Sequence, residues 1–319
     1  MSKELTLRFS RWGEVSEDHF RSISKLINMA VGRDCVLVNN PNKQVDIDIS
    51  SVYGDRGELD NLYTRVSRKI ETLTPGGVQF GPWAKLYNFQ PSKNAKVNIF
   101  YTPENVRCPY GDWDGYLSFD RDSYGGKNAY FPLWWLTCTD MFSEKSGHFL
   151  GERMSLEVMM NSRIPIIKKR KNFCVAFIGM PYPHRLQSLS ALASIGRVDV
   201  FGKFAGKYTE SKLKESKDYK FVFCFENDLY PGYVTEKVFE AWATGAIPLY
   251  WGADPDGYIN PKAIINLNDF DSIDDFLGFV SKVNKDPDLW ESIASQPIIQ
   301  RAPNLGEALR VLSNALSGL

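Results

Sequence analysis

Short apolar runs bounded by turn-forming residues recur along the whole chain. Several are apolar almost throughout, as in residues 221–225, and strands that are buried on both faces have this composition. We therefore predict a series of short strands arranged in parallel sheets. In sequence order they cover residues 5–9, 35–38, 45–49, 97–101, 115–119, 173–178, 198–201, 219–225, 247–251 and 263–267.

Helical patterns alternate with these strands. Residues 185–195 and 236–244 each carry apolar side chains at a spacing that places them on one helical face. Gly196 and Gly245 follow them, where a glycine commonly ends a helix. Leucines at 305, 309, 312 and 316 predict a terminal packing helix rather than a membrane anchor. The alternation of strands and helices indicates right-handed crossovers and an α/β fold.

The length of 319 residues exceeds what one hydrophobic core usually supports, so we expect two domains. Pro165 and four basic residues at 168–171 precede a new buried strand. We place the boundary there, with domains at 1–163 and 164–319. The basic run is interpreted as a solvated linker, and contact with an anionic membrane surface is the alternative. Ligands of such domains bind outside the carboxyl ends of the strands.

Composition narrows the possible function and compartment. The chain has 38 basic and 38 acidic residues, so it lacks the basic excess that a nucleic-acid binder would show. An anionic ligand would then be held by local basic residues. The N-terminus has no apolar signal stretch, no segment reaches the ~20 apolar residues that span a bilayer, and no N-glycosylation sequon occurs. These observations favour the cytoplasm over the secretory path.

The five cysteines are odd in number, and no two are close in sequence. Three lie in or beside apolar runs, which favours buried reduced thiols over a disulfide framework. No spacing of cysteines and histidines resembles a zinc site. The residues concerned are Cys35, Cys108, Cys138, Cys174 and Cys224, with His19, His148 and His184.

The segment 219–251 joins a buried strand to a helix through a polar loop. The strand ends at Phe225, the loop covers 226–233, and Thr235 stands at the expected N-cap of a helix that begins with Glu236. Free backbone N–H groups and the helix dipole both favour an anion at such a helix start. This strand–loop–helix unit is therefore predicted to bind phosphate.

Two basic residues occupy electrostatically unfavourable places. Lys237 lies in the first turn of this helix, and Arg185 lies in a first turn that begins near Pro183. The helix dipole opposes a cation there by up to about 1 kcal/mol, unless an anion lies between the cation and the helix end. Both residues follow buried strands, so together they could hold one diphosphate. The alternative is that both are ordinary surface cations.

Three neighbouring residues have both a structural and a binding interpretation. The helix dipole favours Glu236 in a first turn, and its carboxylate could also accept hydrogen bonds from ribose hydroxyls. Tyr233 could close the loop by packing. Asn227 could stabilise a turn. On the residues alone, these alternatives stay open.

A candidate catalytic carboxylate lies in the first half of the chain. Glu104 follows the carboxyl end of the strand predicted at 97–101. A glutamate in a loop can equally be solvent-exposed without a catalytic role. Asp112 and Asp114 are rival carboxylates nearby. Aromatic residues of this half could stack on sugar faces, with core packing as the default for each. They are Tyr110, Trp113, Tyr130, Trp134 and Trp135.

A long ordered pattern in the second half resembles the signature of the α-1,3/4-fucosyltransferase family. It covers residues 223–227, 232–237, 246–252, 260–262 and 268–270. Shorter matches occur at 51–54, 99–105 and 131–135. One departure is the strand end at 178–180, which reads Ile-Gly-Met where the family usually has Ser-Asn.

The resemblance implies a GT-B fold, in which two Rossmann-like domains face each other across a cleft. The acceptor site would be largely in 1–163 and the donor site in 164–319. The reaction would invert the fucose anomeric carbon without an obligatory metal, a divalent ion being at most stimulatory. The implied roles are general base for Glu104, phosphate contacts for Arg185 and Lys237, and further GDP-fucose contacts for Asn227, Tyr233 and Glu236.

The function expected from this resemblance is transfer of L-fucose from GDP-fucose to a hydroxyl of an N-acetylglucosamine- or glucose-containing glycan, with α-1,3 linkage. The acceptor would be an oligosaccharide or a lipid-linked glycan, reached in the cytoplasm or at the inner membrane surface. A Golgi-lumenal location would apply only if a membrane anchor precedes this sequence. The alternatives are a GT-B enzyme for another nucleotide sugar and a non-catalytic sugar- or nucleotide-binding protein.

Overall fold

Two compact units make up the chain. The computed structural model describes residues 4–12, 17–53, 89–109, 111–142, 154–164 and 170–319. The N-terminal unit comprises Met1–Leu136, Tyr230–Tyr233 and Asn304–Leu319, and the C-terminal unit comprises Thr137–Leu229 and Val234–Pro303. Each contains a parallel sheet with strands close to the predicted positions, so the α/β class is confirmed.

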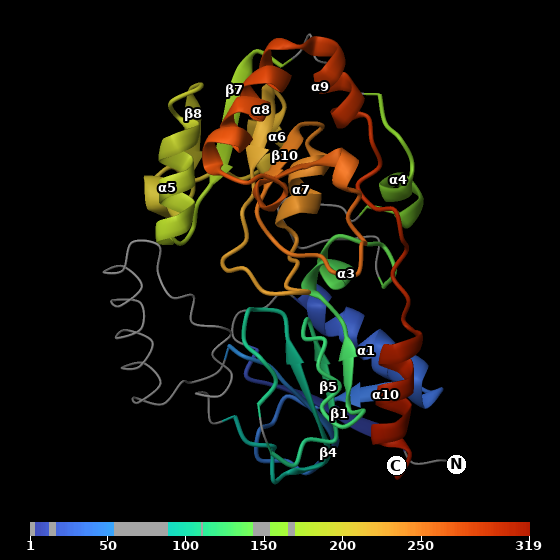
Figure 1. Ribbon diagram of the computed structural model, residues 1–319. Coiled ribbons are helices and arrows are strands. Elements are labelled where there is room, and N and C mark those ends of the chain that lie inside the picture. Colours follow the sequence, from blue (N-terminus) through green and yellow to red (C-terminus); the bar gives the residue numbers. More distant parts are fainter. Residues whose placement is uncertain (1–3, 13–16, 54–88, 110, 143–153, 165–169) are drawn as a thin grey trace. The chain divides into compact units, whose positions relative to one another are not determined.

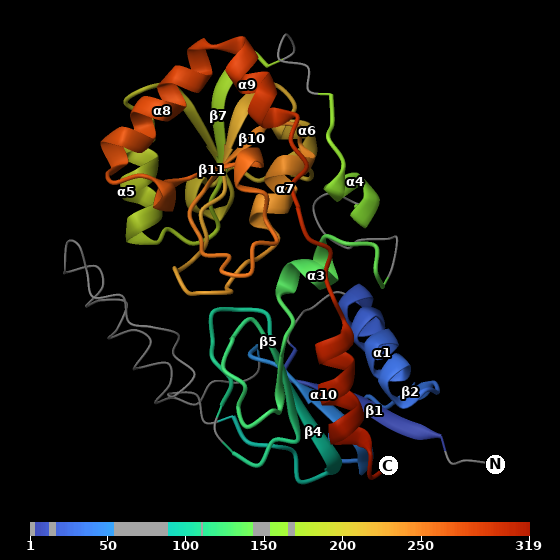
Figure 2. The ribbon, with the colours of Figure 1, turned by 45° about the vertical axis from the view of Figure 1, so that its right-hand side comes forward.

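The N-terminal unit is built on a six-stranded parallel sheet with the order β2-β1-β3-β4-β5-β6. Helices α1 (Glu17–Val31) and α10 (Gly306–Leu316) lie side by side against it in both ribbon views (Figures 1 and 2). Val311 and Leu312 of α10 are buried, as expected for a packing helix. The strands are β1 (Leu5–Ser10), β2 (Cys35–Leu37), β3 (Val45–Ser50), β4 (Ala95–Thr102), β5 (Gly115–Ser118) and β6 (Asn128–Tyr130).

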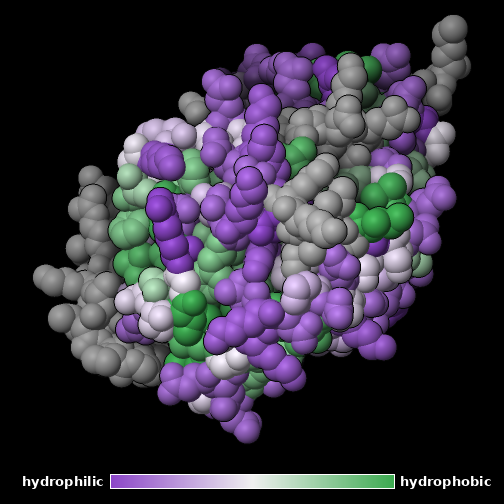
Figure 3. All heavy atoms as spheres, turned by 90° about the horizontal axis from the view of Figure 1, so that it is seen from above, coloured by the Kyte–Doolittle hydropathy of each residue, from purple (hydrophilic) through white to green (hydrophobic). Residues whose placement is uncertain are grey.

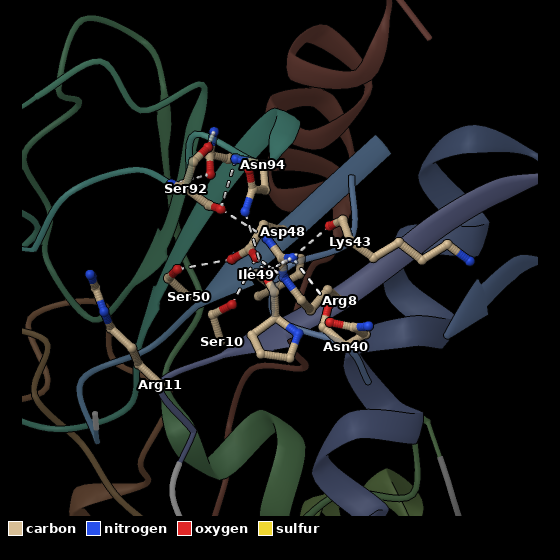
Figure 4. A network of polar contacts seen from close by, with 12 residues as sticks. Arg8, Ser10, Arg11, Asn40, Lys43, Asp48, Ile49, Ser50, Ser92 and Asn94 are labelled. Carbon is tan, nitrogen blue, oxygen red and sulfur yellow. Dashed lines mark hydrogen bonds and ion pairs between the residues drawn. The ribbon is translucent and has the colours of Figure 1, made fainter. Parts of the chain in front are cut away.

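A buried ion pair joins β1 to β3 in this unit (Figure 4). Arg8 Nε lies 2.6 Å from Asp48 Oδ2, and both side chains are almost completely buried. The hydroxyls of Ser10 and Ser50 donate to the same carboxylate. The Arg8 guanidinium also donates to the hydroxyl of Ser92 and to backbone carbonyls. Because hydrogen bonds satisfy both charges, this pair holds the strands in register rather than offering a site.

The C-terminal unit contains a five-stranded parallel sheet with the order β11-β10-β9-β7-β8. The chain passes from β7 to β8 on one side and then returns to β9 on the other side of β7. The direction of winding therefore reverses between β7 and β9, and ligands of open α/β sheets bind at such a switch point. The strands are β7 (Asn172–Phe177), β8 (Val198–Phe201), β9 (Tyr219–Phe223), β10 (Ile247–Tyr250) and β11 (Ile265–Asn266).

Both faces of this second sheet are covered. Phe221 and Phe223 point into a cluster with α8 and α9, whereas α7 packs on β10. The exposed side of α8 carries Asp274 and Lys282, and hydrophilic residues predominate in the coloured part of the face shown in Figure 3. The helices are α3 (Leu133–Thr137), α4 (Leu156–Met160), α5 (Pro183–Leu192), α6 (Lys212–Ser216), α7 (Lys237–Ala243), α8 (Ile273–Lys285) and α9 (Pro287–Ala294).

The two predicted helix-ending glycines differ in their outcome. Gly245 follows α7 with a φ of +83°, so it adopts the expected left-handed conformation. Helix α5 ends at Leu192, and Gly196 is not left-handed, so that prediction was wrong. A Cβ at Gly196 would overlap the ring of Phe173. A glycine is therefore required at 196 because Phe173 packs closely against it, and not because the helix ends with a left-handed residue.

The contacts divide the chain differently from the boundary expected at 163/164. Residues 304–319 return to the N-terminal unit because α10 buries its apolar face there. Residues 137–163 belong to the C-terminal unit, where Arg163 donates to the carbonyls of Ala246 and Ala294. Arg170, interpreted as part of a solvated linker, is partly buried and donates to backbone carbonyls, among them that of Thr244. Lys171 is exposed, as expected for a solvated linker, and 168 and 169 lie outside the described residues.

The described residues contain no helix long and apolar enough to cross a membrane. All five cysteines are free, and four of them are buried, as predicted. Burial raises the pKa of Cys108 to about 12, so this thiol stays protonated near neutral pH.

Candidate active site

The switch point of the C-terminal sheet brings two predicted residues together. Arg185 is the third residue of α5, which follows β7, and Asn227 lies in the loop after β9. The Arg185 Nη1 atom is 3.4 Å from Asn227 Oδ1 and 3.4 Å from the carbonyl oxygen of Met180. Arg185 is 3% exposed. A buried guanidinium at the carboxyl ends of two adjacent strands is a suitable anion contact.

Lys237 begins α7, and its ammonium contacts a residue that the sequence reasoning did not select. Lys237 Nζ lies 3.0 Å from Glu226 Oε2 and 3.0 Å from the hydroxyl of Thr235. Glu226 is completely buried at the end of β9. The anion that accompanies the first-turn lysine in this structure is therefore an internal carboxylate. Its position directly after a buried strand was the signal available in the sequence.

Thr235 does not cap α7, which corrects the prediction. The N-cap residue is Glu236, with helical backbone angles and no side-chain cap. The Thr235 hydroxyl lies 2.8 and 3.0 Å from the two oxygens of Glu226, and its backbone N–H donates to that carboxylate. The Thr235 hydroxyl therefore donates to a buried carboxylate instead of accepting a hydrogen bond from a free N–H group of α7. Glu236 stands at the expected helix start, partly buried.

His184 is a second residue that was not predicted for this region. Its Nε2 atom lies 3.3 Å from the carbonyl oxygen of Glu226, and its ring packs on Trp251 with centroids 4.5 Å apart. Burial lowers the pKa of His184, and the positive charge of Arg185 lowers it further. The hydrogen bond to the Glu226 carbonyl raises the pKa but does not outweigh these two effects. His184 is therefore neutral near pH 7, and Arg185 and Lys237 supply the positive charge of the region.

The other predicted residues meet in the N-terminal unit. Glu104 lies just after β4, and its two carboxylate oxygens accept hydrogen bonds of 3.3 Å from Tyr53 and 3.4 Å from Tyr233. Tyr233 is part of the segment 230–233 that packs in this unit, with its ring edge-on to Phe119. Gly232 has a φ of +88°, which this turn requires. Two phenols thus hold the candidate base, and Tyr53 had not been assigned a role.

The rival carboxylates and the aromatic residues have structural explanations. Asp114 accepts a hydrogen bond of 2.8 Å from the backbone N–H of Asn98 on β4, whereas Asp112 is exposed. Core packing, the default for the aromatic residues, is what the structure shows for those it describes. Trp113, Tyr130, Trp134 and Trp135 are buried. Three residues named in the sequence analysis lie outside the described residues. They are Tyr110, His148 and Gly54, the last residue of the short family match at 51–54.

The two parallel sheets and the cationic strand ends agree with the predicted GT-B fold. A solved α1,3-fucosyltransferase matches this chain with a TM-score of 0.67 and 21% identity, over 98% of this chain and 90% of its own, which confirms the predicted fold. Residues 166–293 match the model of the family described as "Glycosyltransferase family 10 (fucosyltransferase) C-term". This part of the chain is therefore similar to the fucosyltransferases of glycosyltransferase family 10, and the resemblance found in the sequence is confirmed.

Two curated relatives illustrate the similarity. The α-(1,3)-fucosyltransferase FucT of Helicobacter pylori is 24% identical over 231 residues, which cover 64% of this chain and 47% of that protein. The 4-galactosyl-N-acetylglucosaminide 3-α-L-fucosyltransferase FUT6 of Pan troglodytes is 32% identical over 219 residues, which cover 66% of this chain and 56% of that protein. The chain thus spans about half or less of the length of the curated relatives it matches.

Proposed function

We propose that this chain transfers L-fucose from GDP-fucose to a sugar hydroxyl. The observation that carries the proposal is the pair of cationic residues, Arg185 and Lys237, at the strand ends of the C-terminal unit. They lie in a family 10 fucosyltransferase domain. A solved α1,3-fucosyltransferase with GDP-fucose has the same fold at 20% identity. The expected acceptor is an N-acetylglucosamine- or glucose-containing glycan, oligosaccharide or lipid-linked, with an α-1,3 linkage formed.

Donor binding would use charge that the chain itself supplies. The buried guanidinium of Arg185 and the ammonium of Lys237 would contact the diphosphate, with Asn227, Tyr233 and Glu236 on the rest of the donor. As GDP leaves, negative charge grows on its terminal phosphate, and fixed cations stabilise that charge. A divalent metal is then not obligatory in the proposed reaction, although it could stimulate the release of GDP.

The acceptor would be activated by Glu104. Its carboxylate would remove the proton from the attacking hydroxyl while the bond to GDP breaks on the opposite face of the sugar, which inverts the anomeric carbon. A general base needs to be ionised and oriented, and the two phenol hydrogen bonds described above favour both. Peripheral contact with the inner membrane surface would suit a lipid-linked acceptor.

Glu104→Gln tests this assignment. The amide keeps the shape of the side chain but cannot take a proton, so we expect GDP affinity within about twofold of wild type and fucosyl transfer lowered by 10²-fold or more. Isothermal titration with GDP and mass spectrometry of N-acetyllactosamine with several nucleotide sugars measure the two properties. Glu307→Gln, an exposed change in the same unit, is the matched control. Full transfer by the Glu104 variant would remove Glu104 from the mechanism.

A further inference from the structure

The carboxylate of Glu226 collects hydrogen bonds from three parts of the C-terminal unit. It accepts from the Lys237 ammonium at 3.0 Å, from the hydroxyl and backbone N–H of Thr235 at 2.8–3.0 Å, and from the Tyr250 hydroxyl at 3.4 Å. These donors stand at the start of α7, in the loop before it and at the end of β10. Glu226 itself is 0% exposed and follows β9.

Such a carboxylate is costly unless an opposite charge accompanies it. Transfer of an ionised carboxyl from water into a protein interior is strongly unfavourable, and a paired, hydrogen-bonded cation offsets that cost. Lys237 is the cation that pairs with Glu226 in the described part of the chain, and its side chain is only 18% exposed. Packing alone does not require a carboxylate here, because a glutamine could fill the same volume and accept the Thr235 hydrogen bonds.

The geometry also fixes a side chain that is otherwise mobile. A lysine ammonium is carried on four flexible methylene groups, and ordering them on ligand binding lowers affinity. Here Glu226 and Thr235 hold the Lys237 nitrogen from two sides before any ligand arrives. Arg185 lies at the same strand end, since its guanidinium is 3.4 Å from the side-chain oxygen of Asn227, the residue after Glu226.

We infer that Glu226 is a positioning residue for donor binding. Glu226 would not contact the donor itself. It would hold the ammonium of Lys237 at the carboxyl end of β9, where that ammonium can bind a nucleoside diphosphate. The inference rests on the proposed function, because it takes Lys237 as a phosphate contact. A buried acidic residue, which by charge alone would repel the diphosphate, thereby increases the affinity for it by ordering the lysine.

The test is a double-mutant cycle between Glu226→Gln and Lys237→Met, read as the Kd for GDP by titration calorimetry. We expect about a tenfold weaker Kd for Glu226→Gln, a similar or larger loss for Lys237→Met, and no further loss when both changes are combined. Glu226→Asp, which keeps the charge, should recover part of the affinity. In steady-state kinetics the loss should appear mainly as a higher KM for GDP-fucose and less in kcat.

A single Glu226→Gln protein that fails to fold still leaves the inference testable. The double variant removes both buried charges together, which proteins tolerate better than one unpaired charge. Its Kd for GDP must then equal that of Lys237→Met, and a Kd tenfold weaker would overturn the inference. Equal GDP affinity of folded Glu226→Gln and wild type would also overturn it. Failure of wild type to bind GDP would instead refute the proposed function.

Discussion

Removal of the two tyrosine hydroxyls that contact Glu104 should raise the pH that the proposed fucosyl transfer requires. Tyr233→Phe and Tyr53→Phe each keep the ring and delete one hydrogen-bond donor to the carboxylate. A donor to an ionised group stabilises the charged form, so its loss favours protonation of Glu104. Because a protonated carboxyl cannot act as a base, the acidic limb of the pH–rate profile should move upward in both variants.

The size of the shift follows from the geometry. A hydrogen bond to a charged group contributes about 1.5–3 kcal/mol at good geometry. The two bonds here are long, 3.3 and 3.4 Å, and Tyr53 is 37% exposed, so about 1 kcal/mol each is the better value. Since one pH unit corresponds to 1.36 kcal/mol, each single variant should shift the limb by about 0.7 unit and the double variant by about 1.5 units.

The assay is kcat/KM for fucosyl transfer measured from about pH 3 to 8, with folding checked by circular dichroism at each pH. Tyr208→Phe is the control, since that ring is 77% exposed in the C-terminal unit and should leave the limb in place. Tyr53→Phe separates this effect from donor binding, because only Tyr233 is also proposed to contact GDP-fucose. Unshifted acidic limbs in folded Tyr53→Phe and Tyr233→Phe would refute the reasoning.

Three further changes probe the fold around the site. Burial acts to raise the pKa of Asp46, but hydrogen bonds, chiefly from Lys96, outweigh it and hold that pKa at about 2. Asp46→Asn should therefore lower the free energy of unfolding by about 1–2 kcal/mol at pH 7. In urea titrations, the difference from wild type should vanish as the pH falls from about 4 to 2. Leu312→Ala should destabilise the protein by about 2–5 kcal/mol in thermal unfolding, and a loss below 1 kcal/mol would contradict the packing of α10. Gly232→Ala should weaken transfer at least as much as Tyr233→Phe, because its Cβ would collide with the Phe119 carbonyl and displace the segment that carries the tyrosine; unchanged kinetics would count against that segment's role.

The periodicity of apolar residues was sufficient to locate most strands. The run at 247–251 corresponds closely to β10, whose four residues are all buried, because a strand buried on both faces needs apolar side chains at nearly every position. The run at 198–201 coincides with β8, a partly buried strand at the edge of the sheet. The strand β6 was missed, since Asn128–Tyr130 begins with a polar residue and is too short to show an apolar run. The run at 263–267 contains only the two residues of β11, because it begins at the end of a 3₁₀ helix, Pro261–Ala263.

Polar residues were harder to place than apolar ones. Arg185 and Asn227 were both assigned to the donor site, and the structure brings them together because they follow strands that are adjacent in the sheet. Glu226 and Thr235 could not, since their partners depend on where α7 and β10 lie in space. A threonine before a helix is a good N-cap by local rules, and a buried carboxylate nine residues earlier in the chain competes successfully for its hydroxyl. Local propensity cannot reveal such a competitor.

The return of α10 has a consequence for how the protein could be divided or rebuilt. The C-terminal unit comprises Thr137–Leu229 and Val234–Pro303, so it is inserted within the N-terminal unit, and the segment Tyr230–Tyr233 between its two parts belongs to the N-terminal unit. A fragment ending at 163 would expose the apolar sides of α1 and β5 and should aggregate. Domain exchange among relatives should therefore leave α10 with the host that it packs against, and an exchanged 137–303 should keep the host's residues at 230–233.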